Sequence, residues 1–455
     1  MRTAAAGVFV YLGVLSLAQA RPGNPERYPV GASIQGMGGV AVGAGTDAWH
    51  NPAGLGRLTQ QGVSASVSAY GLTTESVPAY VNDSSGGLPI KGSLSSTSVD
   101  VFPADFAYVK PLGVALGLTH GIGLSVVVPD YDLFDGALQL PAEDLLLEMR
   151  ARVQSESKTY WIVPGYGACL DGRFCVGVAP AAAIHLENDS FISTVFTEYA
   201  NGSTYDTSTA RKNELLAAAL GVQLGAQVAV TDRLWVGLTL RSPVRTVYSR
   251  GSVLHAHSVV DTANNQAYVD RVEVTKPYLD YRQPWRLAAG VAYVAPATFS
   301  AALDLRLTSG TGDYVTRAGP NGEVSLPPTF PGGQIDDPSR AVNIQEGNVY
   351  APAINVNLGG SYQVTDALAA QAGLFTDLSA TPERAVSEYY QTRLSRVGLT
   401  LGMGYAGELA TTWLALVYAR GRGQILGYGA GAAPVVTDAT SQSVMLMLGS
   451  TASLK

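Results

Sequence analysis

The sequence predicts an all-β protein: a transmembrane, antiparallel, up-and-down β-barrel of about 14 strands with an N-terminal hatch inside its lumen. Three observations support this fold class. Hydrophobic residues make up 47% of the chain and charged residues only 14%, yet after the first twenty residues no apolar stretch approaches the roughly 20 residues that a spanning helix needs. From Gly62 onward, apolar and polar residues alternate with a period of two. The connections between the alternating segments are long and short in turn, as in bacterial outer-membrane barrels.

The first element is a signal peptide over residues 1–20. Arg2 supplies the positive charge, residues 4–17 form the apolar core, and Ala18-Gln19-Ala20 is a small-residue cleavage site. A membrane anchor is the alternative, but roughly 14 apolar residues are short for a bilayer. We therefore expect an exported protein whose mature chain begins near Arg21.

Residues 21–61 follow as the expected hatch, a plug that packs inside the barrel. A glycine-rich stretch over residues 36–45 precedes Asn51-Pro52-Ala53-Gly54-Leu55. A nucleotide-binding loop would need a Lys-Ser/Thr pair and a strand-to-helix setting, and neither is present. Pro52 restricts Asn51 to extended geometry, and asparagine side chains bond readily to nearby backbone, so the motif predicts a fixed turn. A turn that leads into the first strand and a gate held against the wall are both compatible with it. We interpret His50 as a packing residue of the hatch rather than a proton switch.

Residues 62–455 are expected to form the barrel. Leu220, Val222 and Leu224 share one face of a strand, whereas Gly221 and Gln223 share the other, so one face suits lipid or a core and the other suits water. A β-sandwich would produce the same alternation, and the connection lengths decide for the barrel. Seven long and six short connections place both termini in the periplasm. The expected strands are 62–71, 99–110, 112–127, 148–166, 174–186, 213–230, 233–248, 285–295, 298–308, 351–364, 367–378, 395–406, 411–420 and 443–452.

Aromatic residues lie beside the short connections, where Trp and Tyr favour the boundary between hydrocarbon and headgroups. They predict a girdle at the periplasmic rim, made of Tyr108, Trp161, Phe174, Trp235, Tyr293, Phe299, Tyr362, Tyr405 and Trp413.

The segment Asn51-Pro52-Ala53-Gly54-Leu55, after its small-residue stretch, resembles the hatch of the FadL family of outer-membrane transporters. Leu240-Arg241-Ser242-Pro243 and Gln283-Pro284-Trp285 resemble the same family. The resemblance implies a fourteen-stranded barrel of the bacterial outer membrane. It also implies passive uptake of long-chain fatty acids or other hydrophobic compounds, through a hatch movement and a side opening in the wall. One departure is that such barrels usually end in an aromatic residue, whereas this chain ends Leu454-Lys455.

A fatty-acid ligand would need a cation for its carboxylate, and Arg241 and Arg306 occupy lumen-facing positions of the expected strands. Each arginine has the alternative of pairing with an acidic neighbour such as Asp304. An apolar capture surface is expected in the long connection 128–147, with Phe134, Leu138 and Leu140. The alternative is that these side chains only pack their loop.

Cys169 and Cys175 predict a local disulfide across a turn, because an exported protein meets an oxidising compartment. A metal or redox pair is disfavoured because no second Cys pair or nearby His completes a site. We expect no metal and no cofactor.

Two other classes of function remain as alternatives. One is a barrel that binds a protein partner at the surface or in a secretion system, without transport. The other is an enzyme, which we do not expect because the five histidines accompany no recognisable serine motif. The net charge of -7 and the lack of a Lys/Arg run speak against nucleic acid. The expected partners are a hydrophobic small molecule and outer-membrane lipid, bound by a monomer.

Overall fold

The protein is described here from a computed structural model. The described residues are 24, 29–83, 90–141, 146–198, 202–262, 264–275, 278–295, 298–318, 346–388, 391–428 and 434–454. The predicted signal peptide, residues 1–20, lies outside them. No helix in this part of the chain combines the length and the apolar character that crossing a bilayer requires.

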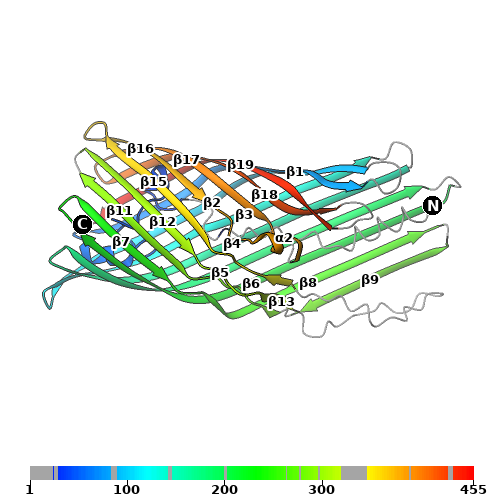
Figure 1. Ribbon diagram of the computed structural model, residues 1–455, viewed down its shortest axis with the longest axis horizontal. Coiled ribbons are helices and arrows are strands. Elements are labelled where there is room, and N and C mark those ends of the chain that lie inside the picture. The colour runs from blue at the N-terminus through cyan, green and yellow to red at the C-terminus, as the bar shows by residue number, and fades with distance from the viewer. Residues whose placement is uncertain are drawn as a thin grey trace.

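A closed ring of antiparallel strands forms the body of the molecule (Figure 1). Among the described residues fourteen strands make the ring, because β5 pairs with β6 and β1 pairs with β19. The predicted all-β barrel of about fourteen strands is confirmed. The ring strands are β1 Gln61–Asp83, β2 Ile90–Ala115, β3 Leu118–Pro141, β4 Leu146–Leu170, β5 Phe174–Glu198, β6 Thr204–Ala229, β7 Leu234–Arg241, β11 Arg286–Ala295, β12 Phe299–Thr308, β15 Ala353–Gln363, β16 Leu368–Asp377, β17 Arg393–Ala406, β18 Ala410–Tyr428 and β19 Pro434–Leu454.

Several strands are much longer than the sequence predicts. The described parts of two segments expected as long loops, 72–83 with 90–98 and 128–141 with 146–147, are instead extensions of strands. Hydropathy defines only the part of a strand that meets lipid, so these extensions carry no comparable signal. The remaining elements are β8 Arg245–Asp261, β9 Gln266–Thr275, β10 Tyr278–Leu279, β13 Tyr314–Ala318, β14 Glu346–Asn348, α2 Glu383–Glu388 and the 3-10 helices η1 Gln35–Met37 and η2 Pro52–Arg57.

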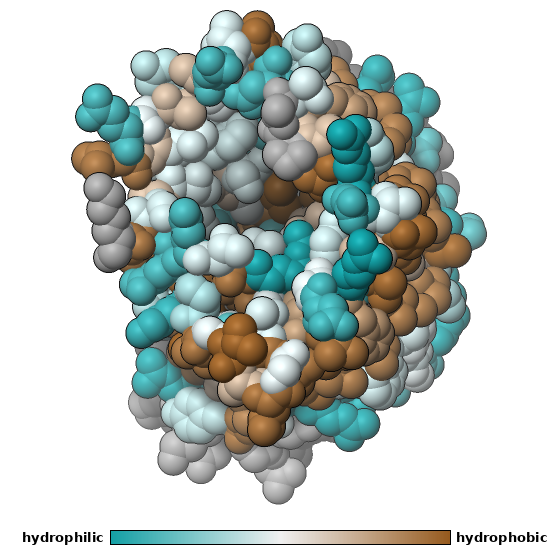
Figure 2. Space-filling view, turned by 90° about the vertical axis from the view of Figure 1, so that its left-hand side faces the viewer, coloured by the Kyte–Doolittle hydropathy of each residue, from teal (hydrophilic) through white to brown (hydrophobic). Residues whose placement is uncertain are grey.

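The outer surface of the ring is apolar, as the alternation predicts. On β17, Thr400 is 0% exposed and its neighbour Leu401 is 50% exposed, so the apolar face points outward. A surface this apolar is unsuited to water and suits acyl chains. Figure 2, which looks onto the end that carries the short turns, shows the apolar side chains along the outer wall. Other outward side chains of this kind are Leu220, Val222, Leu224, Val236, Leu238, Leu303, Leu305, Val356, Leu358, Val397 and Leu399.

The predicted aromatic girdle is correct in part. Phe174, Tyr293, Phe299, Tyr362 and Tyr405 are exposed beside short turns. Three tryptophans in the predicted girdle instead face the lumen. Trp161 is fully buried, Trp235 lies under the guanidinium of Arg57, and Trp413 lines an inner cavity. Their side chains belong to the surroundings of the hatch, because strand parity turns these positions inward.

Candidate functional site

The hatch motif is anchored by the side chain of Asn51, which is completely buried. Its Oδ1 accepts a hydrogen bond from the Ala53 amide at 3.1 Å, which caps η2. Its Nδ2 donates to the Val42 carbonyl at 2.9 Å and to the Ala226 carbonyl of β6 at 3.2 Å. Asn51 has the extended backbone that Pro52 requires, with φ -156° and ψ 104°. One side chain thus joins the turn, the rest of the hatch and the wall.

The hatch backbone lies directly against glycines of the wall. A Cβ added to any of these glycines would come within 3.0 Å of a backbone atom of the hatch. Only glycine allows the two backbones to approach so closely. Among the described strands ten contribute one such residue each: Gly121, Gly167, Gly177, Gly225, Gly237, Gly290, Gly359, Gly373, Gly402 and Gly449. We call this set the glycine ring.

Polar side chains of the wall also bind the hatch. We call these side chains, together with the glycine ring, the seat of the hatch. Asp304 of β12 is fully buried, and its Oδ2 accepts from the amides of Ala41 at 2.8 Å and Val42 at 3.1 Å. Arg306 donates to the Gly39 carbonyl at 2.7 Å and lies 3.7 Å from Asp304. The alternative pairing of Arg306 with Asp304 is therefore present, but both residues are directed chiefly at the hatch.

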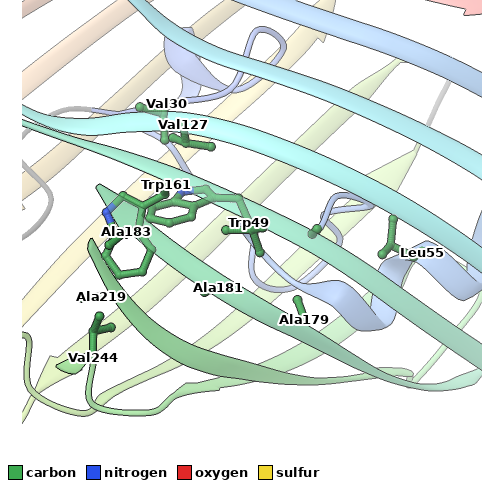
Figure 3. Packing of buried hydrophobic residues seen from close by; sticks show 12 residues of the cluster. Val30, Trp49, Leu55, Val127, Trp161, Ala179, Ala181, Ala183, Ala219 and Val244 are labelled. Atoms are coloured by element: carbon green, nitrogen blue, oxygen red, sulfur yellow. The ribbon is translucent and has the colours of Figure 1, made fainter. Parts of the chain in front are cut away.

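Two tryptophans cover the outer side of the motif. Trp49 of the hatch packs against Trp161 of β4 with ring centroids 5.5 Å apart (Figure 3). The guanidinium of Arg241 lies 3.9 Å from the Trp49 ring centroid and donates to Gln223 at 2.7 Å. Gln223 in turn donates to the Trp49 carbonyl at 2.9 Å. This stack binds the hatch to β4, β6 and β7 through cation-π and hydrogen-bond contacts.

His50 forms an ion pair inside the hatch. Its Nδ1 lies 2.8 Å from Asp47 Oδ2 and its Nε2 lies 3.2 Å from the Val30 carbonyl. Both ring nitrogens face acceptors, so the geometry suits the doubly protonated imidazolium. Burial lowers the pKa of His50, but the charge and hydrogen bond of Asp47 outweigh it and raise the pKa above its usual value. Burial likewise raises the pKa of Asp47, yet His50 holds that pKa below its usual value.

Two cavities lie on opposite sides of the hatch. The outer cavity, about 80 Å³, is lined by the ends of β7, β11, β12 and β15 that are remote from the short turns. The inner cavity, about 340 Å³, is lined by wall residues close to the short turns. Val30, Trp49 and His50 line both cavities. We call these three residues the septum, because they separate the two spaces.

The outer cavity is cationic. Arg241, Arg286 and Arg306 line it, whereas no Asp or Glu is among its described lining residues. At about 80 Å³ it holds only two or three water molecules at roughly 30 Å³ each. The space therefore suits a small anionic group rather than a whole lipid chain.

The backbone pairing of the wall is interrupted beside this cavity. β2 and β3 pair up to Ser96 opposite Gly136 and again from Asp105 opposite Val127, in the same register. Between these points the backbone of 97–104 and 128–135 is described throughout and forms no β2–β3 pairing. Pro129 on β3, which has no amide hydrogen to donate, lines the outer cavity at this level. We call this interruption the slit.

Apolar side chains occupy the lumen next to the slit. Val128 of β3 and Phe375 of β16 belong to one buried cluster with Val417, Met445 and Met447. Phe375 also lines the outer cavity. In a barrel whose lumen-facing positions are mostly polar, this patch gives an apolar surface between the cationic cavity and the slit.

The sequence-predicted site residues have different fates. Arg241 and Arg306 meet at the outer cavity, as described above. Phe134 and Leu138 lie in β3 and not in a loop, and their buried side chains line neither of these two cavities. A role of these residues in ligand capture stays a prediction. The side chain of Leu140 lies outside the described residues. Sequence reasoning missed Trp161 as a hatch contact, the glycine ring and the slit.

Cys169 and Cys175 are joined by a disulfide that links β4 to β5 next to their turn. Both residues are buried against Ala53 of the hatch motif. Within the described part of the chain, no three His, Cys, Asp or Glu residues are arranged to hold a metal ion.

Comparisons with known proteins place this geometry in a structural class. No family model matches the chain. No curated protein matches it either. Solved structures do match over nearly the whole length. A FadL homologue from Pseudomonas aeruginosa aligns with a TM-score of 0.62 and 13% identity, covering 95% of this chain and 100% of that one.

Two further structures align similarly. The P. putida toluene transporter TodX has a TM-score of 0.57 and 13% identity, covering 94% of this chain and 99% of that one. The monoaromatic hydrocarbon channel CymD has a TM-score of 0.54 and 14% identity, with coverages of 93% and 97%. The likeness confirms the fold that the hatch motif's resemblance to the FadL family implies.

Proposed function

We propose that this chain is a channel of the bacterial outer membrane for the passive uptake of amphipathic hydrophobic molecules, with a long-chain fatty acid as the substrate class. The slit carries the proposal. It interrupts the strand pairing of the wall beside a cationic cavity and an apolar patch. In the membrane orientation that we propose, the short turns and both ends of the mature chain lie on the periplasmic side, and the long strand extensions point away from the cell.

The chemistry of the outer half matches such a ligand. A carboxylate would fit the small cavity and meet Arg241, Arg286 and Arg306 through charge-assisted hydrogen bonds. The tail would follow Phe375 and Val128 toward the slit, where each buried methylene contributes about 0.8 kcal/mol. From the slit the tail reaches acyl chains without crossing a polar layer. Two structures of similar fold are a toluene transporter and a monoaromatic hydrocarbon channel, and the apolar patch, but not the arginines, would suit such ligands.

A test is to hold the slit closed. The β2–β3 register is the same on both sides of the slit, and extending it across the slit places Val99 opposite Leu133. Val99→Cys with Leu133→Cys, bridged by a short bis-maleimide, should abolish uptake of labelled oleate by cells that express the channel. The matched control is Tyr108→Cys with Leu124→Cys, a paired position on the same seam, which should leave uptake unchanged.

The outcomes separate the alternatives. Uptake that persists with a bridged slit would refute lateral release. The methyl ester of oleate should bind less well than oleate, because it lacks the charge that the arginines meet. If the parent protein takes up neither compound, the alternative of a partner-binding barrel without transport is favoured.

A further inference from the structure

The proposed uptake route does not use the inner cavity. At about 340 Å³ it exceeds the roughly 150 Å³ that accommodates benzene in a protein interior, and it falls within the range of ligand pockets. The end of the barrel at which it lies is visibly hollowed (Figure 2). Its volume therefore suits a single-ring molecule.

The lining of this cavity mixes apolar and polar groups. Met37 and Val40 of the hatch, Val127 of β3 and Ala302 of β12 supply apolar contact area. Such a surface favours a ring, because burial of apolar area drives association.

Two hydrogen-bond donors in the lining have no partner among the described residues. Ser125 Oγ on β3 and Trp413 Nε1 on β18 are both buried without a hydrogen bond, and Ser125 is 2% exposed. A buried donor without a partner is costly, so natural proteins rarely leave one. Both groups donate, and an acceptor on a ligand would satisfy either of them.

We propose that the inner cavity is a second binding site, which takes a single-ring molecule carrying one hydrogen-bond acceptor. This site lies on the periplasmic side of the septum, away from the arginines of the outer cavity. The inference goes beyond the uptake function, because it requires binding on the inner side of the hatch and no transport.

The experiment uses 4′-fluoroacetophenone and fluorine NMR on the purified full-length protein in detergent micelles, with empty micelles as the blank. The ketone supplies the acceptor, and 4-fluorocumene has a similar shape without one. We expect saturable binding of the ketone, tighter than that of the hydrocarbon. At least one of Ser125→Ala, Trp413→Phe and the double variant should weaken ketone binding by roughly two- to twelvefold, the range for one neutral hydrogen bond. The binding of 4-fluorocumene should stay unchanged in all three.

A matched pair of substitutions locates the site. Ala302→Phe fills the inner cavity and should abolish binding of both probes, whereas Ala288→Phe makes the same change in the outer cavity and should leave binding intact. The proposal is overturned if ketone binding does not saturate, which is the result expected if only water bonds to the two donors. It is also overturned if both donor variants bind the ketone normally, or if only Ala288→Phe reduces binding. If the parent protein binds the ketone but takes up no oleate, the proposed function alone is refuted and the second binding site stands.

Discussion

Asn51 offers the sharpest test of how the hatch is held. Asn51→Ala removes three hydrogen bonds, to Val42, Ala226 and Ala53. The Val42 carbonyl keeps a second donor, Gln227, at 3.3 Å, whereas the Ala53 amide loses its side-chain partner. Two lost bonds at about 1 kcal/mol each and the orphaned Ala53 amide at about 1 to 3 kcal/mol give a loss of about 3 to 5 kcal/mol.

This loss should appear as local opening of the hatch and not as unfolding of the barrel. At 1.4 kcal/mol per factor of ten, the opening equilibrium should shift by roughly two to three and a half orders of magnitude. Amide exchange of residues 29–60, measured by mass spectrometry, should accelerate accordingly, while exchange in the ring strands stays slow.

A control substitution distinguishes the anchor from a general effect of losing an asparagine. Asn355 on β15 accepts hydrogen bonds from Leu378 and Thr376 of the wall and makes none to the described residues of the hatch. Asn355→Ala should leave hatch exchange unchanged. The reasoning is refuted if Asn51→Ala alters hatch exchange by less than about threefold, or if hatch and barrel lose protection together.

Two further predictions concern the seat and the ion pair. Gly177→Val places a side chain against the backbone of Pro52 and should raise ion conductance by displacing the hatch, at an overpacking cost of about 1–3 kcal/mol. Gly312→Val should leave the conductance unchanged, because a Cβ at this position has no atom within 4 Å. Equal conductances of the two variants in planar bilayers would contradict the role of the glycine ring. The stability that charged His50 gives the hatch is fully present below the ordinary His pKa of 6.5 and is lost as pH rises through the raised pKa of His50. The stability that charged Asp47 gives the hatch is present above the ordinary Asp pKa of 3.8 and is lost as pH falls through the lowered pKa of Asp47. Intrinsic-rate-corrected hatch exchange should therefore be slowest between these values and increase toward alkaline pH, and His50→Gln should flatten that dependence; a profile equal to that of the parent would exclude the ion pair as its cause.

The seat argues against wholesale expulsion of the hatch during uptake. Contacts with glycines on ten described strands and the buried bonds of Asn51 and Asp304 would have to break together. The route that we propose, through the slit, leaves these contacts in place.

The sequence alone determined the features that depend on local chemistry. Period-two alternation placed Leu220 and Leu401 on the lipid-facing side, because successive residues of a strand point to opposite faces. It also predicted the extended geometry of Asn51, which follows from the proline after it. Strand number and direction came from the same alternation and from connection lengths.

Only the tertiary structure decided what the lumen-facing residues touch. Closing the ring brings Gly177 against Pro52 and Arg241 over Trp49, and these contacts join residues far apart in the chain. Alternation cannot distinguish a lumen position that faces water from one that faces the hatch, which is why Trp161 was assigned to the rim. The sequence signals the slit only through Pro129, which lacks an amide hydrogen. The bulge of β3 against β4 between Val127 and Asp130 and the loss of β2–β3 pairing depend on how the strands meet in space.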